Sequence, residues 1–473
     1  MSAPVVHWFR RDLRLRDNSA LHAAAASGAP VVPLFILDPA LLSRQRVGTA
    51  RLDFLLKALH ALDDALMRYH ARLIVRYGAP DDVLPALIAE TRAQAVYANR
   101  DVSPYARARD ERLAQALRVP LHLYDDAYLL PPEAVLKADG KPYVVYTPYR
   151  NAWNALPKPS VSELAFTPAH FYSALTPQPI PTLSELGHPP AINTPPADED
   201  SAHDLLNAFI ASDLHHYSDK RNDLPSAPYS TPRPRGTSYL SPYLRLGVLS
   251  PRHAYWAARQ AYQGTPSEAY RESIQTWVSE LTWRDFYAQI LYHFPHVLER
   301  DFVDTYLSLE WRNAPSDLQA WQKGETGYPI VDAPMRQLNA IGWMPNRARM
   351  VVASFLTKHL LIHWKQGDIY FMRHLIDGDT ASNNGGWQWS AGTGTDAQPY
   401  FRIFNPISQS QKFATAAYLR HWLPELASVP DKHVHTPWLA PTPPKEYPLP
   451  IVAHEFARQR TLNAFKSARG EKS

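Results

Sequence analysis

The sequence predicts an α/β N-terminal domain built on a parallel sheet, followed by a larger all-α domain. In the first third of the chain, short and nearly continuous apolar runs alternate with helical patterns, which is typical of parallel strands covered by helices on both faces. After residue 203 the pattern is helical almost throughout. Between these parts, ten prolines in the segment 157–196 favour an extended connector wrapped over the surface. We therefore expect domains at 1–130 and 203–473, joined by a proline-rich linker at 131–202.

The α/β domain is expected to contain five strands with helices between them. The strands are predicted at 5–9, 31–37, 73–77, 95–98 and 121–124. The helices are predicted at 19–27, 51–70, 81–90 and 105–117, so each interval between strands is long enough for the crossover that parallel strands require. No GxGxxG motif follows the first strand, and NAD binding is therefore not expected.

The carboxyl ends of these strands form the edge at which open parallel sheets bind ligands. Asp38 follows the second strand, and Asn99 and Asp101 follow the fourth. These residues either line a ligand crevice or lie in solvated loops, and the sequence alone favours neither alternative.

The all-α domain is predicted from runs of helical periodicity after the linker. The helices are expected at 205–212, 242–246, 251–260, 268–294, 333–341, 345–363 and 369–376. Two of these starts carry Ser-Pro pairs, at Ser241 and Ser250, because Pro suits the first turn of a helix. As structure these are two capped helices, but Thr237 and Ser238 with Ser241 also place hydroxyl groups where a helix N-terminus favours an anion such as a pyrophosphate.

Composition excludes several classes of function. The chain has 473 residues, 45% of them apolar, and no Cys. Disulfides, thiolate nucleophiles, iron–sulfur clusters and cysteine-ligated zinc are therefore excluded, no metal site is expected, and redox chemistry requires an organic cofactor. No apolar run is long enough to span a bilayer, and the start MSAPVVHWFRRD carries charge where a secretory signal is apolar, so a cytoplasmic location is expected. The net charge of +4 permits DNA binding through a local basic surface but does not require it.

The segment 376–406, IDGDTASNNGGWQWSAGTGTDAQPYFRIFNP, concentrates polar and aromatic residues. Two carboxylates, Asp377 and Asp379, precede a pair of asparagines, and a Gly-Gly step precedes Trp387 and Trp389. Singly, these residues also fit a helix cap, a turn and ordinary core. Together they indicate a site for a planar ring with polar edges, because a loop rarely combines two indoles with turn-forming residues.

A helical segment, QTWVSELTWRDFYAQ, places a carboxylate, a guanidinium and indoles together. Helical spacing puts Trp277, Glu280 and Arg284 on one stripe, with Trp283 and Tyr287 on the neighbouring one. This is either a helix that packs its indoles inward, with a Glu280–Arg284 ion pair at the rim, or a wall against a bound ring.

The motif GWMPNRARM contains a second candidate surface. If the helix begins at the proline, Asn346 and Met350 lie one turn apart on the same side, where an amide can read a base edge and a thioether fits a flat ring. Arg347 and Arg349 face elsewhere, one toward phosphate and the other toward an acidic partner such as Asp377.

These motifs resemble the DNA photolyase/cryptochrome family. SELTWRDFY, GYPIVDAPMRQLNAIGWMPNRARM, the segment 376–406 and the opening HWFRRDLRLRDN are similar to class I cyclobutane pyrimidine dimer photolyases, and the resemblance covers essentially the whole chain. It implies a Rossmann-like α/β antenna domain and an all-α FAD-binding domain. It also implies light-driven repair of ultraviolet-damaged DNA by electron transfer from excited reduced FAD to a flipped-out dimer. Such an enzyme is a light-dependent carbon–carbon lyase, expected to be a monomer with no obligate protein partner.

The resemblance also implies a role for each motif residue. The residues expected to contact FAD are Tyr217, Thr237, Ser238, Leu240, Ser241, Trp277, Arg284, Arg349, Asp377, Asp379 and Asn383. The residues expected to contact the dimer or the DNA strand are Arg221, Glu280, Trp283, Asn346, Arg347, Met350, Trp389 and Gln409. Glu280 is expected to hydrogen-bond the dimer and Asn383 to face the flavin nitrogen N5. An electron relay is expected to run from Trp387 through Trp364 to Trp311.

A second, antenna chromophore is implied in the N-terminal domain, either methenyltetrahydrofolate or 8-hydroxy-deazaflavin. Folate-type members carry an Asn-Glu pair where this chain has Tyr105-Ala106 in DVSPYARARD, so the segment looks closer to deazaflavin-binding members. Another pigment or an empty crevice also remains open.

Three alternatives to dimer repair are distinguishable. A cryptochrome-like photoreceptor shares the fold and flavin, but Asn383 resembles the photolyase choice, and the end at Ser473 leaves little room for a signalling tail. A (6-4) photolyase resembles this chain too, but that group has His at the positions of Asn346 and Met350. A flavin-independent protein that stacks nucleic-acid bases on Trp makes no use of the carboxylates and amides of the segment 376–406.

Overall fold

The computed structural model describes residues 3–43, 46–190, 194–224 and 236–470. The chain forms two compact units. The N-terminal unit consists of Met1–His215, Ser238–Pro295 and Ile376–Asp379, and the C-terminal unit consists of His216–Thr237, His296–Leu375 and Thr380–Ser473. These units are defined by compactness and differ in extent from the predicted domains and linker, whose borders remain a prediction.

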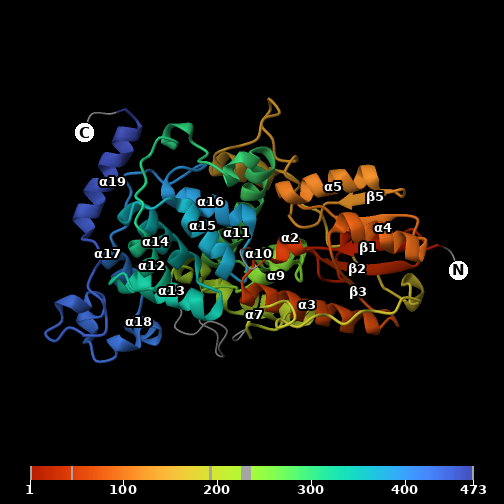
Figure 1. Cartoon of the computed structure of the whole chain (residues 1–473), viewed down its shortest axis with the longest axis horizontal. Coiled ribbons are helices and arrows are strands. Elements are labelled where there is room, and N and C mark those ends of the chain that lie inside the picture. Colours follow the sequence, from red (N-terminus) through yellow and green to blue (C-terminus); the bar gives the residue numbers. More distant parts are fainter. Residues whose placement is uncertain (1–2, 44–45, 191–193, 225–235, 471–473) are drawn as a thin grey trace. The chain divides into compact units, whose positions relative to one another are not determined.

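The N-terminal unit contains a five-stranded parallel sheet in the order β3-β2-β1-β4-β5. The strands are β1 (Val5–Phe9), β2 (Val31–Leu37), β3 (Ile74–Tyr77), β4 (Val96–Asn99) and β5 (Leu121–Tyr124). The strand order reverses between β1 and β4, which is the point where doubly wound sheets bind ligands. On one side of the sheet lie α4 (Pro80–Thr91) and α5 (Pro104–Ala116), and on the other lies α3 (Thr49–Met67), as Figure 1 shows. The predicted α/β class and all five strands are confirmed.

The central strands β1 and β2 are buried on both faces, which explains their nearly continuous apolar sequence, whereas the edge strands β3 and β5 are partly exposed. Every residue of β1 and β2 is buried. Val6, Leu34 and Val96 of the central strands share a core cluster with Leu84 of α4 and Leu113 of α5. The helical crossovers therefore supply the layer that covers this face of the sheet.

The proline-rich segment is extended, as predicted. In the described part of 157–196, the helical structure is limited to the 3-10 turn Pro168–His170. The preceding α6 (Tyr146–Ala155) was not predicted, although its buried aromatic residues recur at helical spacing. The following α7 (Glu199–Ala211) begins earlier than predicted because the Asp198 carboxylate accepts from Ser201 N at 2.7 Å and caps it.

Helices make up most of the remaining chain, which confirms the predicted all-α part. The helices of the N-terminal unit that have not yet been named are α1 (Ser19–Ala26) and α2 (Pro39–Leu42) of the α/β part, and α9 (Ser241–Leu246), α10 (Pro251–Gly264) and α11 (Glu268–His293) of the all-α part. In the C-terminal unit they are α8 (Tyr217–Lys220), α12 (Pro315–Lys323), α13 (Pro329–Ile341), α14 (Asn346–Ser354), the π-helix η5 (Phe355–His359), α15 (Trp364–His374), α16 (Thr380–Ala391), α17 (Pro406–Phe413), α18 (Ala416–Trp422) and α19 (His454–Ala468).

One prediction about this part was wrong, and one alternative for the segment 376–406 is excluded. The helix expected at 345–363 ends earlier, since α14 passes into η5 and Leu361 has a φ of 53°, which no right-handed helix accommodates. The Gly-Gly step at Gly385 and Gly386 does not form a turn, because both residues lie inside α16. Helix α16 therefore carries the central part of the segment 376–406 on a rigid element instead of a loop.

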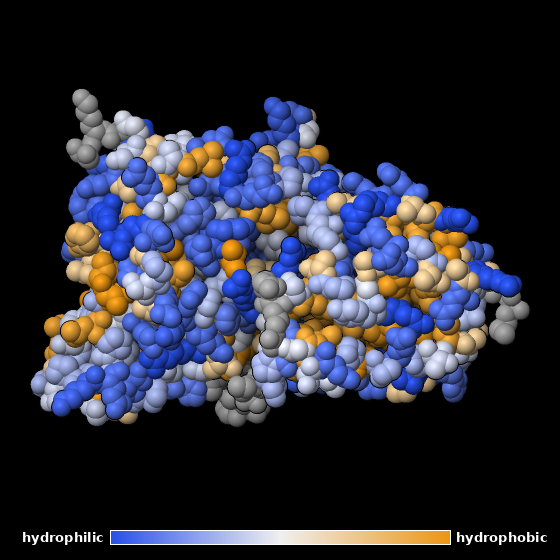
Figure 2. Space-filling model, in the orientation of Figure 1, coloured by the Kyte–Doolittle hydropathy of each residue, from blue (hydrophilic) through white to orange (hydrophobic). Residues whose placement is uncertain are grey.

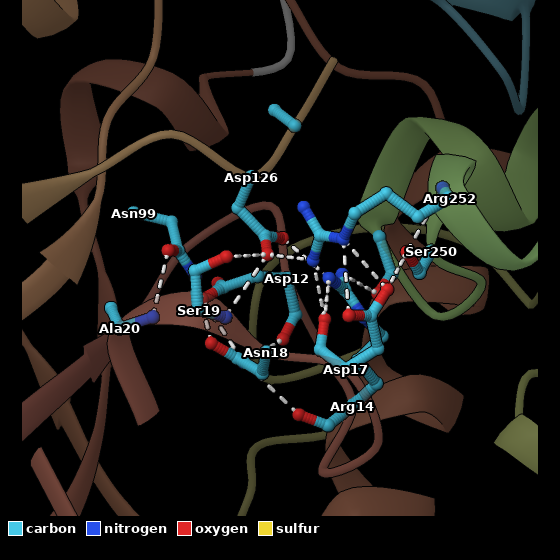
Figure 3. Close-up of polar contacts among 12 residues, drawn as sticks. Asp12, Arg14, Asp17, Asn18, Ser19, Ala20, Asn99, Asp126, Ser250 and Arg252 are labelled. Atoms are coloured by element: carbon cyan, nitrogen blue, oxygen red, sulfur yellow. Dashed lines mark hydrogen bonds and ion pairs between the residues drawn. The ribbon is translucent and has the colours of Figure 1, made fainter. Parts of the chain in front are cut away.

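A buried network of charges joins the sheet to α10 in the N-terminal unit (Figure 3). The Arg252 guanidinium donates through Nε to Asp17 Oδ2 at 2.8 Å and through Nη2 to Asp126 Oδ1 at 2.6 Å. Arg14 pairs with the second oxygen of Asp126, and Ser250 donates to Asp17. Burial opposes ionisation of Asp126, but the nearby Arg14 and Arg252 outweigh it and hold its pKa below the usual range.

Among the described residues, no helix is long and apolar enough to cross a membrane. Figure 2 shows hydrophilic residues over much of the visible surface, with hydrophobic ones between them.

The buried network predicts a large effect of removing one of its cations. Arg252→Met would leave Asp17 and Asp126 buried with one guanidinium fewer, so we expect the free energy of unfolding to fall by about 3–5 kcal/mol. The control is Arg16→Met, because Arg16 pairs with Asp200 at the surface, where both side chains are at least half exposed and such pairs contribute about 0–1 kcal/mol. Urea titration followed by circular dichroism measures both, and equal midpoints for the two variants would contradict the prediction.

Candidate functional site

The polar residues at the carboxyl edge of the sheet have defined partners. Asn99 is buried, its amide nitrogen donates to Asp12 Oδ2 at 2.6 Å, and its oxygen accepts from Ala20 N at 3.1 Å. The solvated-loop alternative is wrong for Asn99, because its amide is buried and hydrogen-bonded, and a ligand crevice near it stays a prediction. Asp38 instead accepts from the Tyr105 hydroxyl, and burial together with this bond raises the pKa of Tyr105 to about 12.

Three arginines contact the acidic start of the segment 376–406 within the N-terminal unit. Arg51 Nη1 and Arg245 Nε each donate to Gly378 O at 2.8 Å. Arg11 Nη2 lies 2.7 Å from Asp379 Oδ2. Sequence reasoning missed all three, because they lie more than a hundred residues from the motif and no local pattern marks them.

Two of the residues predicted to contact FAD are anchored along α11. Trp277 is buried with its ring centroid 5.4 Å from that of Phe209. Arg284 donates to Ala127 O at 2.5 Å and to Leu244 O at 3.0 Å. The guanidinium therefore holds two neighbouring chain segments, and its contact with FAD remains a prediction.

The stretch of α11 between Trp277 and Arg284 carries the predicted lesion residues. Glu280 and Trp283 are both half-buried, and the Trp283 ring lies 5.4 Å from the ring of Tyr287. The predicted neighbourhood of Trp283 and Tyr287 is confirmed. A carboxylate and an indole on adjacent positions of one helix can offer a hydrogen-bond acceptor beside a flat apolar wall.

The two Ser-Pro pairs differ in their capping. Ser250 caps α10, since its side chain accepts from Arg252 N at 3.1 Å. Helix α9 begins at Ser241 itself, with Leu240 in the cap position and no side-chain cap bond, so the expected cap at Ser241 is wrong. Ser238 and Leu240 lead into α9 in the N-terminal unit.

Two arginines lie close together in the C-terminal unit. Arg347 donates to Asn222 Oδ1 at 2.9 Å, and burial together with repulsion from Arg221 lowers its pKa. Neighbouring guanidinium groups of this kind favour an anion such as a DNA phosphate. On the same helix, Asn346 is exposed with its amide nitrogen 4.0 Å from Met350 Sδ, which confirms that these two residues share a face.

Asn383 on α16 is oriented by Asp368 on the neighbouring α15. Its amide nitrogen donates to the Asp368 carboxylate at 2.6 Å and to the Asp368 carbonyl at 3.1 Å. Burial raises the pKa of Asp368 to about 6, against the opposing effects of Lys365 and of the bond from Asn383. With both N–H groups directed at Asp368, the amide presents its oxygen as an acceptor, which fits the N5–H donor of a reduced flavin.

Trp387 lies one turn further along α16 and packs against α15. A Cβ added at Gly367 would come within 2.0 Å of the Trp387 indole, so only glycine leaves room for this ring. The indole also meets Phe371, whose centroid is 4.9 Å away. Because Trp364 begins α15, the packing places Trp387 within one turn of Trp364 along that helix.

The other predicted relay residues lie at the start of α15. Trp364 is fully buried and donates through Nε1 to Asp301 Oδ1 at 2.6 Å. The ring of His363 lies 5.3 Å from Trp364 and 5.2 Å from the half-buried Trp311. The structure therefore gathers the three predicted indoles around α15, and electron transfer between them remains a prediction.

The remaining predicted residues, except Asp377, lie in the C-terminal unit. Tyr217 is buried, and the Arg221 guanidinium lies 5.5 Å from its ring centroid. Arg349 donates to Met344 O at 2.9 Å. The half-buried members are Thr237, Trp389 and Gln409. Of the other FAD residues, Asp377 belongs to the N-terminal unit, where it is buried.

A buried lysine forms a hydrogen bond with the C-terminal end of α16. Lys358 lies in the π-helix η5, an uncommon element often found at functional sites. Its Nζ donates to Ala391 O at 2.6 Å, and the ammonium lies 3.9 Å from the ring of Phe465. Burial lowers the pKa of Lys358 to about 7.

This lysine predicts a pH-dependent contribution to stability. A lysine in the unfolded chain titrates near 10.4, so between pH 7 and 10 the folded protein releases a proton that the unfolded chain retains. Stability contributed by this group therefore rises with pH across that window, by a few kcal/mol in order of magnitude. Lys358→Met should lose this rise, whereas Lys141→Met, at an exposed position, should keep it. Melting midpoints at pH 6.5 and 9.5 measure the difference, and a wild-type slope in Lys358→Met would refute it.

Comparison with known proteins assigns both parts of the chain to one family. Residues 5–168 match the family model described as DNA photolyase, and residues 277–467 match the model of the FAD binding domain of DNA photolyase. The chain is 41% identical to a deoxyribodipyrimidine photo-lyase from Synechococcus, over 98% of this chain and 96% of that protein.

Solved structures share the fold over nearly the full length. A class III photolyase from Agrobacterium tumefaciens has a TM-score of 0.88 and 36% identity, covering 99% of this chain and 98% of that one. A cryptochrome from Synechocystis has a TM-score of 0.87 and 29% identity, covering 98% and 99%. With its photolyase domain, its FAD-binding domain and its full-length relatives, the chain belongs to the DNA photolyase family.

Proposed function

We propose that the chain is a light-driven DNA photolyase that uses FAD to split cyclobutane pyrimidine dimers. The observation that carries the proposal is the pairing of Asn383 with Asp368, which presents an amide oxygen beside the buried Trp387. Relatives named deoxyribodipyrimidine photo-lyase support the substrate class. The assignment to class I rests on the motifs alone, since a class III photolyase shares the fold over nearly the whole chain.

The residues of the C-terminal unit would engage the DNA strand. A dimer inside a duplex has to be flipped out before a cofactor can reach it, and its weakened pairing reduces that cost, as in other enzymes that act on extruded bases, photolyases included. Arg221 and Arg347 would contact phosphates. Asn346, with Met350 beside it, would meet the extruded bases through an amide and a thioether, and Trp389 and Gln409 would complete this surface.

The residues of the N-terminal unit would hold the dimer and part of the cofactor. Glu280 would accept a hydrogen bond from the dimer, and Trp283 would cover one of its rings. Asp379, which Arg11 and Arg245 fix, would bind FAD together with Asp377. When bound and excited by blue light, reduced FAD supplies the electron that opens the cyclobutane ring and recovers it afterwards.

We also propose an antenna chromophore at the carboxyl edge of the sheet. The Tyr105–Asp38 bond lies at this edge, where open sheets bind ligands. Whether the pigment is a folate, a deazaflavin or another molecule is not assigned. The cytoplasmic location and the monomeric state likewise remain predictions.

Repair in light and not in darkness is the expected outcome for the purified protein. A single-stranded oligonucleotide with one thymine dimer is incubated with the protein under blue light and in darkness, and the restored thymines are measured by chromatography. Equal yields in both samples would reject the enzyme. Flavin absorbance that responds to light without any repair would instead support a cryptochrome-like photoreceptor, and a colourless protein would support a flavin-independent nucleic-acid binder.

The relay predicts that Trp387→Phe abolishes reduction of oxidised FAD by light, because the first electron donor is lost. Repair by enzyme whose flavin has been reduced with dithionite should persist, since that step bypasses the relay. Trp256→Phe is the matched control, because Trp256 is exposed on α10. Flavin absorbance under illumination reports the result, and unchanged photoreduction in Trp387→Phe would show that the relay is wrongly assigned.

A further inference from the structure

The short helix α6 lies along α11 and is fastened to it within the N-terminal unit. Trp153 donates through Nε1 to Asp285 Oδ2 at 3.0 Å. Gln289 donates to Tyr143 O at 2.8 Å. Because Asp285 and Gln289 lie on consecutive turns of α11, these two bonds fix the position of the segment from Tyr143 to Trp153 along that helix.

Tyr146 on α6 contacts the turn of α11 that carries the predicted lesion residues. Its ring stacks on the indole of Trp283, with centroids 3.5 Å apart and planes at 5°. Its hydroxyl donates to Ser279 O at 3.0 Å, one helical turn before Trp283. One side chain therefore holds both the ring of Trp283 and the backbone on which that ring is mounted.

The stack leaves the indole of Trp283 little freedom. Tyr146 covers one face, and Phe286 meets the ring edge-on with centroids 5.6 Å apart. Tyr146 is itself buried, so it cannot readily move away, while Trp283 is only half-buried. Tyr287 is a third aromatic neighbour, with centroids 5.4 Å apart and planes at 31°, so a ligand would meet the part of the half-buried indole that stays exposed.

We propose that Tyr146 is a positioning residue that fixes Trp283 as a rigid wall for the pyrimidine dimer and thereby sharpens discrimination against undamaged DNA. The inference rests on the proposed function of Trp283. The cyclobutane ring holds the two pyrimidines of a dimer at a fixed angle, so a wall that contacts one of them must itself have a fixed orientation. An unstacked indole would have to be ordered on binding, which weakens affinity.

The two groups of Tyr146 make separable contributions. The stack acts on the side-chain torsions of Trp283, whereas the hydroxyl bond acts on the position of the Ser279 carbonyl. Tyr146→Phe keeps the stack and should retain dimer affinity to within about twofold. Tyr146→Leu removes the stack and should weaken dimer binding by about two- to tenfold, the range expected of an aromatic pair.

The experiment measures affinity for a thymine-dimer oligonucleotide and for its undamaged counterpart, with the FAD-loaded full chain in darkness. Tyr146→Leu should lose affinity for the dimer alone, with FAD content and melting midpoint near wild type. Tyr143→Leu is the matched control, since Tyr143 precedes α6 and its ring meets Tyr149 at 6.4 Å. Tyr146→Met, which fills the volume with a flexible chain, is the second variant should Tyr146→Leu not fold.

A double-mutant cycle separates this inference from the proposed function. Trp283→Leu should reduce dimer affinity, and adding Tyr146→Leu to it should produce no further loss, because the wall is already absent. If wild type discriminates and Trp283→Leu does not, but Tyr146→Leu binds the dimer like wild type, the role of Tyr146 is overturned while the proposed function stands. If wild type itself binds both oligonucleotides equally, both fail. An equal loss of affinity for the two oligonucleotides in Tyr146→Leu would reduce Tyr146 to a structural residue.

Discussion

The buried charge network around Asp17 and Asp126 is the constraint on which the N-terminal unit depends. Two carboxylates and the guanidinium groups of Arg14 and Arg252 are removed from water there, which is tolerable only if each oxygen and N–H group finds a partner. That requirement leaves one arrangement of α10 against the sheet. Since α11 follows α10 in the chain and packs on it, the network also determines where the predicted lesion residues stand.

The C-terminal unit uses buried ionisable groups differently. Asp368 has Lys365 Nζ 3.9 Å from its carboxylate, but burial dominates and raises its pKa to about 6. Burial likewise lowers the pKa of Lys358, to about 7. Both groups contact α16, Asp368 near its start and Lys358 at its end. Helix α16 is therefore flanked by side chains whose charge is poorly stabilised, a pattern that is more common at functional sites than in inert cores.

The strands and the helix faces could be predicted because their signals are local. Continuous apolar runs identify buried parallel strands, and helical spacing alone placed Trp283 beside Tyr287. The supports could not be predicted. Nothing near Asp379 points to Arg11, and nothing near Trp283 points to Tyr146, since each partner comes from a distant segment whose position is fixed by tertiary packing. The break of the helix after η5 and the helical state of the Gly-Gly step were likewise decided by packing over propensity.

Three of the predicted side chains, Trp283, Trp387 and Asn383, lie on helices, and each is supported by a residue from another helix. Tyr146 stacks on Trp283, Gly367 leaves space for the Trp387 indole, and Asp368 accepts a hydrogen bond that orients the Asn383 amide. A loop could bring the same groups together, but it would have to be ordered whenever substrate bound, and that ordering would weaken binding. Helices α11, α15 and α16 are ordered by their own cores. Their side chains can therefore keep the orientation that the proposed electron transfer and dimer recognition require, and a substitution at a supporting residue should alter function before it alters the fold.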